Sequence, residues 1–188
     1  MHDDPRFERR EPSELTLEAL RPEDGELLAN LLELYIHDLS AIFARVELDA
    51  SGRFGYPSLS AYLSGRTDRF AFLLRCSGRV AGFALAKRGS PVSDDPNVLD
   101  VAEFFVLRRY REHGVGRAAA ALLWDRLPGA WTIRALVANT GAVSFWRRAV
   151  AAYTRGSGTE REHLDGTSSW LVFSFDNTGY AIGGAGHG

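Results

Sequence analysis

Apolar residues change their spacing along the chain, and these changes predict the order of its helices and strands. Leucines two positions apart within residues 13–20 are typical of a first strand. Apolar residues then recur every three or four positions over 27–43, which predicts a long amphipathic helix with one wide buried face. A loop containing glycine and tyrosine follows at 51–58, and a shorter helical stretch is expected at 59–65.

The rest of the chain predicts strands that are joined in two different ways. Strands are expected at 69–76 and 80–87, and the short connection between them forces an antiparallel hairpin. A third strand at 98–106 leads through a glycine loop into alternating helices and strands. These later elements are a helix at 115–127, a strand at 131–137, a helix at 141–150 and a final strand at 170–175.

This order predicts a mixed α/β fold built on one central sheet. The first half of the sheet is expected to be antiparallel, and a right-handed βαβ crossover makes the two central strands parallel. One compact domain is predicted over residues 13–175. A flexible N-terminal segment is expected at 1–12, and a glycine-rich, disordered tail at 176–188.

Composition narrows the classes of protein that fit. The chain has 188 residues, of which 45% are hydrophobic, and it contains no apolar run long enough to cross a bilayer. Its first residues are charged and interrupted by proline, so we expect no secretory signal, no membrane partner and a cytoplasmic location. The net charge of -2 gives no support for nucleic-acid binding. Cys76, the only cysteine, lies in an apolar strand and is expected to be a buried, inert thiol.

A glycine-containing loop between a predicted strand and a predicted helix is the most informative local feature. From Arg111 to Gly116 the chain reads REHGVG, an RxxGxG pattern. A strand that turns sharply into a helix directs free backbone N–H groups outward at the positive end of the helix dipole, where a pyrophosphate oxygen accepts them. Gly114 and Gly116 carry no β-carbon, so the backbone is expected to approach such a ligand closely.

Two motifs in this region resemble the GNAT superfamily of N-acetyltransferases. The first is EFFV at 103–106, followed by the RxxGxG loop and its helix, which is similar to the acetyl-CoA motif of the family. The second is an NxxAxxFW pattern, formed by Asn139, Ala142, Phe145 and Trp146, which is similar to the family's second cofactor-contacting segment. The resemblance covers roughly residues 13–175, and the LYxxDLS pattern at 34–40 adds a likeness to a poorly characterised bacterial-type subgroup.

The resemblance implies acetyl-CoA as cosubstrate, with its pantetheine arm along β-strand residues where two parallel strands splay apart and its pyrophosphate on the loop amides. The cofactor-binding residues that it implies are Phe104, Phe105, Val106, Arg111, Glu112, His113, Gly114, Val115, Gly116, Arg117, Asn139, Phe145 and Trp146. Other interpretations stay open for some of them. The two arginines are equally well explained as solvated side chains, Asn139 as a helix cap, and Phe145 with Trp146 as core packing.

Acetyl transfer to an amine needs a base, and Glu103 is the leading candidate because it interrupts an apolar strand. The alternative for Glu103 is a salt bridge to a nearby arginine. Asp100 points to the opposite face of an ideal strand, but a β-bulge would reverse this, so it is the second candidate. Trp146 stands where many family members have a tyrosine acid, so the acid is expected to be Tyr153, Tyr110 or water, or the step needs none.

The acceptor pocket is expected from the first helices and the loop between them. Asp38 would hold a cationic amine, walled in by Tyr35 and Tyr56 through cation–π contacts, although this end of the helix is equally explained as a solvated surface. No residue cluster has metal-ligand spacing, so no metal is expected. The function predicted is direct acetyl transfer to a primary amine of a small molecule. The alternatives are acetylation of a protein or peptide amine, and a noncatalytic acyl-CoA-binding domain; a homodimer is left open.

Overall fold

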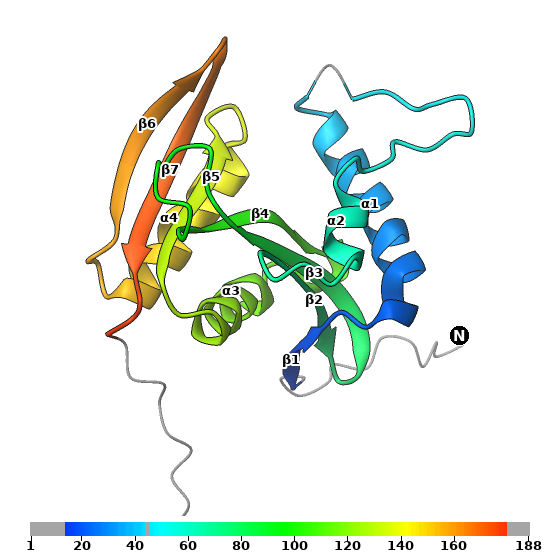
Figure 1. Cartoon of the computed structure of the whole chain (residues 1–188), viewed down its shortest axis with the longest axis horizontal. Helices are drawn as coiled ribbons and strands as arrows, with labels where there is room; N and C mark the ends of the chain where they lie inside the picture. Colours follow the sequence, from blue (N-terminus) through cyan, green and yellow to red (C-terminus); the bar gives the residue numbers. More distant parts are fainter. Residues whose placement is uncertain (1–13, 44–45, 180–188) are drawn as a thin grey trace, which may run out of the picture.

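We describe a computed structural model of the chain, in which residues 14–43 and 46–179 are described. Their elements follow one another as alternating groups of strands and helices (Figure 1). In chain order they are β1 (Leu15–Ala19), α1 (Gly25–Ser40), α2 (Leu59–Leu63), β2 (Arg69–Cys76), β3 (Arg79–Arg88), β4 (Leu99–Val106), α3 (Val115–Arg126), β5 (Ala130–Leu136), α4 (Thr140–Thr154), β6 (Thr159–Asp165) and β7 (Ser168–Asp176), with 3-10 turns η2 (Pro22–Asp24) and η3 (Arg108–Tyr110). None of the described helices is long and apolar enough to cross a bilayer.

The strands form one mixed sheet in the order β1-β2-β3-β4-β5-β7-β6, which confirms the predicted fold class. Strands β1 to β4 pair antiparallel, whereas β4 and β5 are parallel, as the sequence predicted. This parallel pairing covers only Leu99–Val101 of β4 and Trp131–Ile133 of β5. Beyond it the two strands separate, so the middle of the sheet opens toward the carboxyl ends of both strands.

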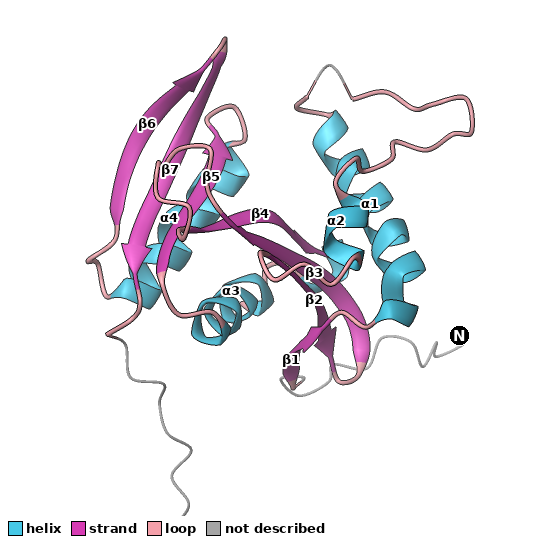
Figure 2. Ribbon diagram, viewed as in Figure 1, coloured by secondary structure: helices cyan, strands magenta, loops and turns pink. Residues whose placement is uncertain are grey.

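Helices cover both faces of the sheet (Figure 2). On one face the aromatic core around Trp124, Trp131 and Trp146 packs under α3 and α4. On the other face α1 and α2 bury leucines and aromatic rings, Leu28 and Phe83 among them. Both faces of the central strands are therefore buried, which explains why they are apolar without strict alternation.

The structure differs from the sequence prediction at β6, which the sequence pattern did not indicate. Its residues, TEREHLD, are mostly charged and exposed, because β6 lies at the edge of the sheet and pairs only with β7. A strand of this kind buries no apolar face and leaves no period-two signal. The predicted helix over 27–43 ends earlier, at Ser40, and α4 continues past the predicted end to Thr154.

The C-terminal boundary also lies further along the chain than predicted. Asp176 is the last residue of β7, and Asn177 is 4% exposed. The Asn177 side chain accepts a hydrogen bond from Gly129 N at 2.7 Å and donates one to Trp124 O at 2.7 Å. Ordered packing therefore extends past residue 175. The predicted N-terminal segment at 1–12 and the part of the predicted tail at 180–188 lie outside the described residues.

Candidate functional site

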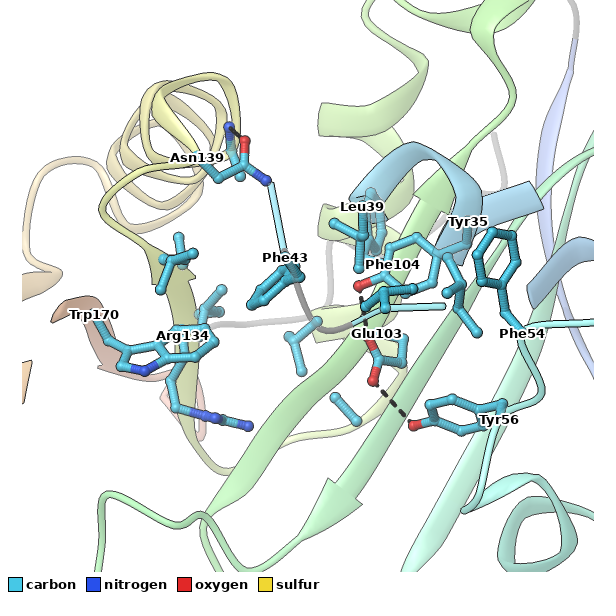
Figure 3. A pocket seen from close by; sticks show the side chains of 18 of the residues that line it. Tyr35, Leu39, Phe43, Phe54, Tyr56, Glu103, Phe104, Arg134, Asn139 and Trp170 are labelled. Atoms are coloured by element: carbon cyan, nitrogen blue, oxygen red, sulfur yellow. Dashed lines mark hydrogen bonds between the residues drawn. The ribbon is translucent and has the colours of Figure 1, made fainter. Parts of the chain in front are cut away.

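A cavity of about 560 Å³ lies where β4 and β5 separate. Both strands, α1, α4, β7 and the chain between α1 and α2 contribute to its wall (Figure 3). The side chains that line it are largely aromatic or aliphatic, with few charged groups among them. Its lining includes Tyr35, Leu39, Phe43, Phe54, Tyr56, Glu103, Phe104, Arg134, Asn139, Trp146 and Trp170.

Glu103 and Glu47 are the two carboxylates that line this cavity, and two tyrosines hold Glu103. Tyr35 Oη donates a hydrogen bond to its Oε2 at 2.5 Å, and Tyr56 Oη donates one to its Oε1 at 3.0 Å. Burial raises the pKa of Glu103 above its usual 4.5, although both tyrosine hydrogen bonds and the charge of Arg134 act in the opposite direction. Glu103 is thus held by hydroxyl groups rather than by the arginine of the alternative interpretation.

A β-bulge places Asp100 on the same face of the sheet as Glu103. Leu85 pairs with Glu103 and Ala86 with Val101, so Ala102 is an extra residue in β4. The sequence analysis allowed for a bulge that would turn Asp100 to the same face as Glu103, and the structure contains this bulge.

Asp100 is nevertheless fully buried and fully engaged, which sets it apart from Glu103. Arg134 donates two hydrogen bonds to its carboxylate, from Nε at 3.2 Å and from Nη2 at 3.0 Å. Ser90 and Thr132 donate to Asp100 Oδ1, and Lys87 Nζ lies 4.0 Å from Oδ2. This arrangement suits an anchor for Arg134 rather than a base that exchanges protons with a substrate.

The two tyrosines come from segments that the sequence had assigned to the acceptor side. Tyr35 lies on α1 with its ring edge-on to Phe83 and near Phe105, which fixes its orientation. Burial, together with the adjacent Glu103 carboxylate, raises the pKa values of both Tyr35 and Tyr56. Both phenols therefore stay protonated at neutral pH and act as donors to Glu103.

The RxxGxG loop has the backbone geometry of an anion cradle. Glu112 and Gly114 have positive φ values of 66° and 77°, and Gly114 is the N-cap of α3. Ala118 N donates to Gly114 O, so the N–H groups of the preceding first turn have no helical acceptor. The first-turn N–H groups and the exposed Arg117 side chain can meet an anion here. His113 Nδ1 lies 2.6 Å from Arg111 O, so its ring forms a hydrogen bond within the loop itself.

Gly114 and Gly116 have different reasons to be glycine. A β-carbon on Gly114 would meet nothing within 4 Å, but the φ of 77° is strained for other residues. A β-carbon on Gly116 would lie 3.0 Å from Phe145 Cε2 and 3.8 Å from Val106 Cγ2. Gly116 therefore allows α3 to pack closely on α4 and β4, in addition to any role toward a ligand.

Arg111 and Asp38 connect the loop to α1 instead of facing the cavity. Arg111 Nε donates to Val106 O at 2.7 Å, and its Nη2 donates to Asp38 Oδ2 at 2.6 Å. Arg108 Nη2 donates to the other Asp38 oxygen at 2.7 Å. The prediction that Asp38 holds the acceptor amine does not fit this geometry, because two arginines already neutralise its carboxylate.

The second motif combines capping and packing. Asn139 Oδ1 accepts a hydrogen bond from Ala142 N at 3.0 Å, so Asn139 caps α4, and it also lines the cavity. Phe145 stacks on Phe104 with ring centroids 5.9 Å apart, and Trp146 meets Phe104 edge-on at 5.1 Å. The core-packing interpretation of this helix is therefore confirmed, without excluding contact with a ligand in the cavity.

Tyr153, the first candidate for the general acid, lies outside the residues that line the cavity. Its hydroxyl donates to Asp125 Oδ1 at 2.7 Å and accepts from Asn177 Nδ2 at 3.2 Å. Its ring packs against Trp124 and Phe175. Because α4 turns this side chain toward α3 and the end of β7, the prediction that it serves as the acid does not fit the structure.

Sequence reasoning missed several residues of the cavity wall, above all Arg134 and Trp170. Arg134 lies over the Trp170 ring, with Cζ 5.7 Å from the ring centroid. Arg134 interrupts an apolar strand just as Glu103 does, and that signal was present in the sequence. Phe43 and Trp170 approach each other, with centroids 6.5 Å apart, although their segments are far apart in the chain, so no sequence signal joined them.

Comparison with known proteins identifies the family. The model of the acetyltransferase (GNAT) family matches residues 28–151, which include the loop, both motifs and the cavity lining except Trp170. The chain belongs to this family and is an N-acetyltransferase. No curated protein matches it significantly by sequence.

Solved acetyltransferases share the fold at low sequence identity. Arabidopsis thaliana NAA60 with a bisubstrate analogue is 17% identical, covers 87% of this chain and 98% of its own, and has a TM-score of 0.57. RimL, a ribosomal L7/L12 protein acetyltransferase in complex with coenzyme A, is 14% identical, with coverages of 86% and 93% and a TM-score of 0.58. A spermidine N-acetyltransferase SpeG chimera from Vibrio cholerae and hSSAT is 14% identical, with 89% and 98% covered and a TM-score of 0.59.

Proposed function

We propose that the protein transfers an acetyl group from acetyl-CoA directly to the primary amine of a small molecule in the cytoplasm. The observation that carries this proposal is Glu103, a carboxylate between two tyrosine hydroxyls in the cavity at the opening of the sheet. The raised pKa of Glu103 brings it closer to the range in which a carboxylate takes up an amine proton near neutral pH.

Acetyl-CoA, when bound, supplies an activated acyl group as a thioester. Residues of this chain suited to holding it are Phe104–Val106 of β4, whose side toward β5 is unpaired beyond Val101, and the first-turn N–H groups of α3. An adenosine diphosphate moiety is anionic, and the N-terminal end of α3 with Arg117 offers positive charge to it. The family's use of acetyl-CoA fits both features.

Glu103 would begin the reaction by taking a proton from the acceptor ammonium, directly or through water. The neutral amine would then form a bond to the acetyl carbon as the carbon–sulfur bond breaks and the electron pair leaves on sulfur, and the nitrogen would lose its second proton to solvent to give the amide. Tyr35 and Tyr56 hold Glu103 in one orientation throughout. Trp146 carries no acidic group, and neither Tyr153 nor Tyr110 lines the cavity, so we assign the protonation of the leaving sulfur to solvent at the cavity mouth.

The side chains that line the cavity favour a small-molecule acceptor over a protein acceptor. The rings of Phe43 and Trp170 lie near each other in the cavity wall, and residues 54–57, which include Tyr56, form another part of that wall. They line the same cavity of about 560 Å³ as Glu103, a volume typical of small-molecule sites, whereas an extended peptide needs a continuous groove. RimL, which shares the fold, is named as a protein acetyltransferase, so a protein or peptide acceptor is the second candidate.

The test measures release of the free CoA thiol from acetyl-CoA with amino acids, polyamines, aminoglycosides and peptides as acceptors. We expect release with at least one small amine, and loss of about 10²-fold or more in kcat/KM for Glu103→Gln. Glu26→Gln, which changes an exposed glutamate in the first turn of α1, is the matched control.

Two outcomes would contradict the proposal. Tight CoA binding without release for any acceptor would favour the noncatalytic acyl-CoA-binding alternative. Release with peptides alone would favour the protein acetyltransferase. An unchanged rate in Glu103→Gln would remove Glu103 as the base while leaving the family assignment intact.

A further inference from the structure

A smaller cavity of about 150 Å³ adjoins the catalytic one on the α1 and α2 side of the sheet. It shares Tyr56, Ala102, Glu103 and Arg134 with the larger cavity, so the two meet at the proposed base. Apart from Ala61, the remainder of its wall is polar, with two further hydroxyl groups and two further cations. These residues are Ser58, Ala61, Tyr62, Arg69 and Lys87.

Strand register lines up the charged groups beneath this small cavity. Arg69 of β2 pairs with Lys87 of β3, and Lys87 pairs with Asp100 of β4. Directly paired residues of antiparallel strands point to the same face, so two cations lie side by side. Such like-charged neighbours destabilise a sheet unless an anion compensates them.

The available carboxylates compensate these cations only in part. Asp68 Oδ2 accepts from Arg69 Nη1 at 2.8 Å, but the same carboxylate also accepts two hydrogen bonds from the exposed Arg66, so two arginines share its single charge. Lys87 and Arg134 share the single carboxylate of Asp100, at 4.0 Å and 3.0 Å. Positive charge is therefore in excess beside the small cavity, while Glu103 contributes one negative charge where the two cavities meet.

We infer that the acceptor is an amino acid whose ammonium group lies at Glu103 and whose carboxylate lies in the small cavity against Lys87 and Arg134. This inference rests on the proposed function and specifies its substrate class. A zwitterion matches both excess charges of the site, whereas a polyamine would place a second cation beside Lys87. A peptide N-terminus has no free carboxylate next to its amine. Tyr62 and Ser58 add hydroxyl groups that donate to a carboxylate.

The experiment compares amino acids with their primary amides and with the corresponding decarboxylated amines, using CoA thiol release. Each trio keeps the side chain and the amine and changes only the acidic group. We expect the best amino acid to exceed its amide by about tenfold or more in kcat/KM, mainly through KM, because charge-assisted hydrogen bonds hold the carboxylate. Equal or better rates with the amides or amines would overturn the inference and leave the proposed function standing.

Lys87→Met tests the small cavity itself, because it keeps the length of the side chain and removes the charge. It is expected to raise KM for the amino acid to nearly that of the amide and to leave the amide unchanged. Arg66→Gln is the control, since Arg66 is exposed and pairs with the same Asp68 outside the cavity wall. An equal loss for acid and amide in Lys87→Met would contradict the inference.

Calorimetric titration of the CoA-saturated protein separates failure of the inference from failure of the proposed function. Amino acid binding that the amide does not share and that Lys87→Met abolishes would support the carboxylate site even without turnover. Absence of turnover for every amine would then count against the proposed function alone. Equal binding of acid and amide would count against the inference, whatever the rates.

Discussion

Tyr35 Oη lies 2.5 Å from Glu103 Oε2, a hydrogen bond between residues 68 positions apart in the chain. It joins the middle of α1 to the bulged part of β4 and occupies one oxygen of the proposed base. Helix α1 therefore does more than cover the sheet, because Tyr35 on its face toward β4 donates to Glu103 and lowers the pKa of Glu103 against the larger effect of burial. The same hydrogen bond therefore joins α1 to the sheet and orients the proposed base.

Glu103→Gln is expected to make the protein more stable while it removes activity. Burial raises the pKa of Glu103 above 4.5, so the folded state binds this proton more tightly than the unfolded chain does. The corresponding stability is present below the unfolded pKa and is lost as pH rises through the folded pKa. The Tm gain of the variant should thus be largest above the folded pKa and vanish toward pH 4.5. Thermal unfolding across pH checks this, and a variant less stable at every pH would contradict it.

Removal of either tyrosine hydroxyl is expected to shift the acidic limb of the activity profile to higher pH. Both hydrogen bonds favour the charged form of Glu103, so Tyr35→Phe and Tyr56→Phe should each raise its pKa further. The shift should be larger for Tyr35, whose contact is 2.5 Å rather than 3.0 Å. The pH dependence of kcat/KM measures it. A shift to lower pH, or a loss of rate that high pH does not recover, would exclude this role.

The sequence predicted most of the fold because the elements that matter most carry local signals. Leucines at helical spacing marked α1, and the short turn after Cys76 marked the β2–β3 hairpin. Apolar β4 and the glycine loop marked the parallel crossover. Cys76 is buried, as predicted from its apolar strand. The charged strand β6 has no such signal, and only its pairing with β7 makes it a strand.

The sequence could predict a site residue only where that residue departs from the pattern around it. Glu103 interrupts an apolar strand, and that anomaly made it the candidate base; the structure places it in the wall of the cavity. Asp38 and Arg111 were assigned to two different ligands, because sequence spacing could not reveal that they bind each other. Their contact depends on how α1 crosses the end of β4. Which residues lie opposite each other in the sheet depends on the strand register and on the bulge in β4. Neither can be read from the sequence.

Gly114→Val is expected to weaken CoA binding by about tenfold or more while the fold persists. Valine at a φ of 77° is strained by about 1–2 kcal/mol, which would displace the N–H groups of the loop. Gly78→Val is a matched control, because Gly78 has a φ of 73° and equally open surroundings in the β2–β3 turn. Both variants should lose a few degrees of Tm, but only Gly114→Val should lose affinity in a CoA titration. If Gly114→Val kept its affinity for CoA, the RxxGxG loop would not be the site that binds the pyrophosphate.

Asp38→Asn is expected to destabilise the link between α1 and the loop. Desolvation opposes ionisation of Asp38, but the hydrogen bonds and charges of Arg111 and Arg108 outweigh it and lower its pKa below 3.8. This stability is present above pH 3.8 and is lost as pH falls through the folded pKa. A double-mutant cycle with Arg111→Gln should give a coupling of about 0.5–1 kcal/mol at neutral pH.

The exposed pair Arg147 and Glu160 serves as the reference for that cycle, since its Nη2 and Oε1 atoms are 2.6 Å apart on the surface of α4 and β6. Its coupling should be smaller, because both side chains are more than a third exposed and solvent screens them. Urea unfolding of the single and double variants measures both cycles. A coupling at Asp38 no larger than this reference would mean that the link contributes nothing measurable.

Asn177→Ala is expected to cost about 3 kcal/mol, although the residue lies beyond the last strand. Its buried amide accepts from Gly129 N and donates to Trp124 O and Tyr153 Oη, so one truncation removes three hydrogen bonds. For a chain of this size the loss corresponds to a Tm decrease of about 6–12 °C.

Asn177→Asp separates the two halves of this amide, because it keeps the acceptor for Gly129 N and replaces the donor with an oxygen that faces Trp124 O. It should be destabilised at neutral pH and recover partly in acid, where a protonated carboxyl can donate again. Asn97→Ala, at an exposed asparagine of the β3–β4 loop, is the control and should change Tm little. If Asn177→Ala unfolded at the same temperature as this control, the end of β7 would not be anchored through the amide, and packing of Phe175 against Trp124 would have to hold it instead.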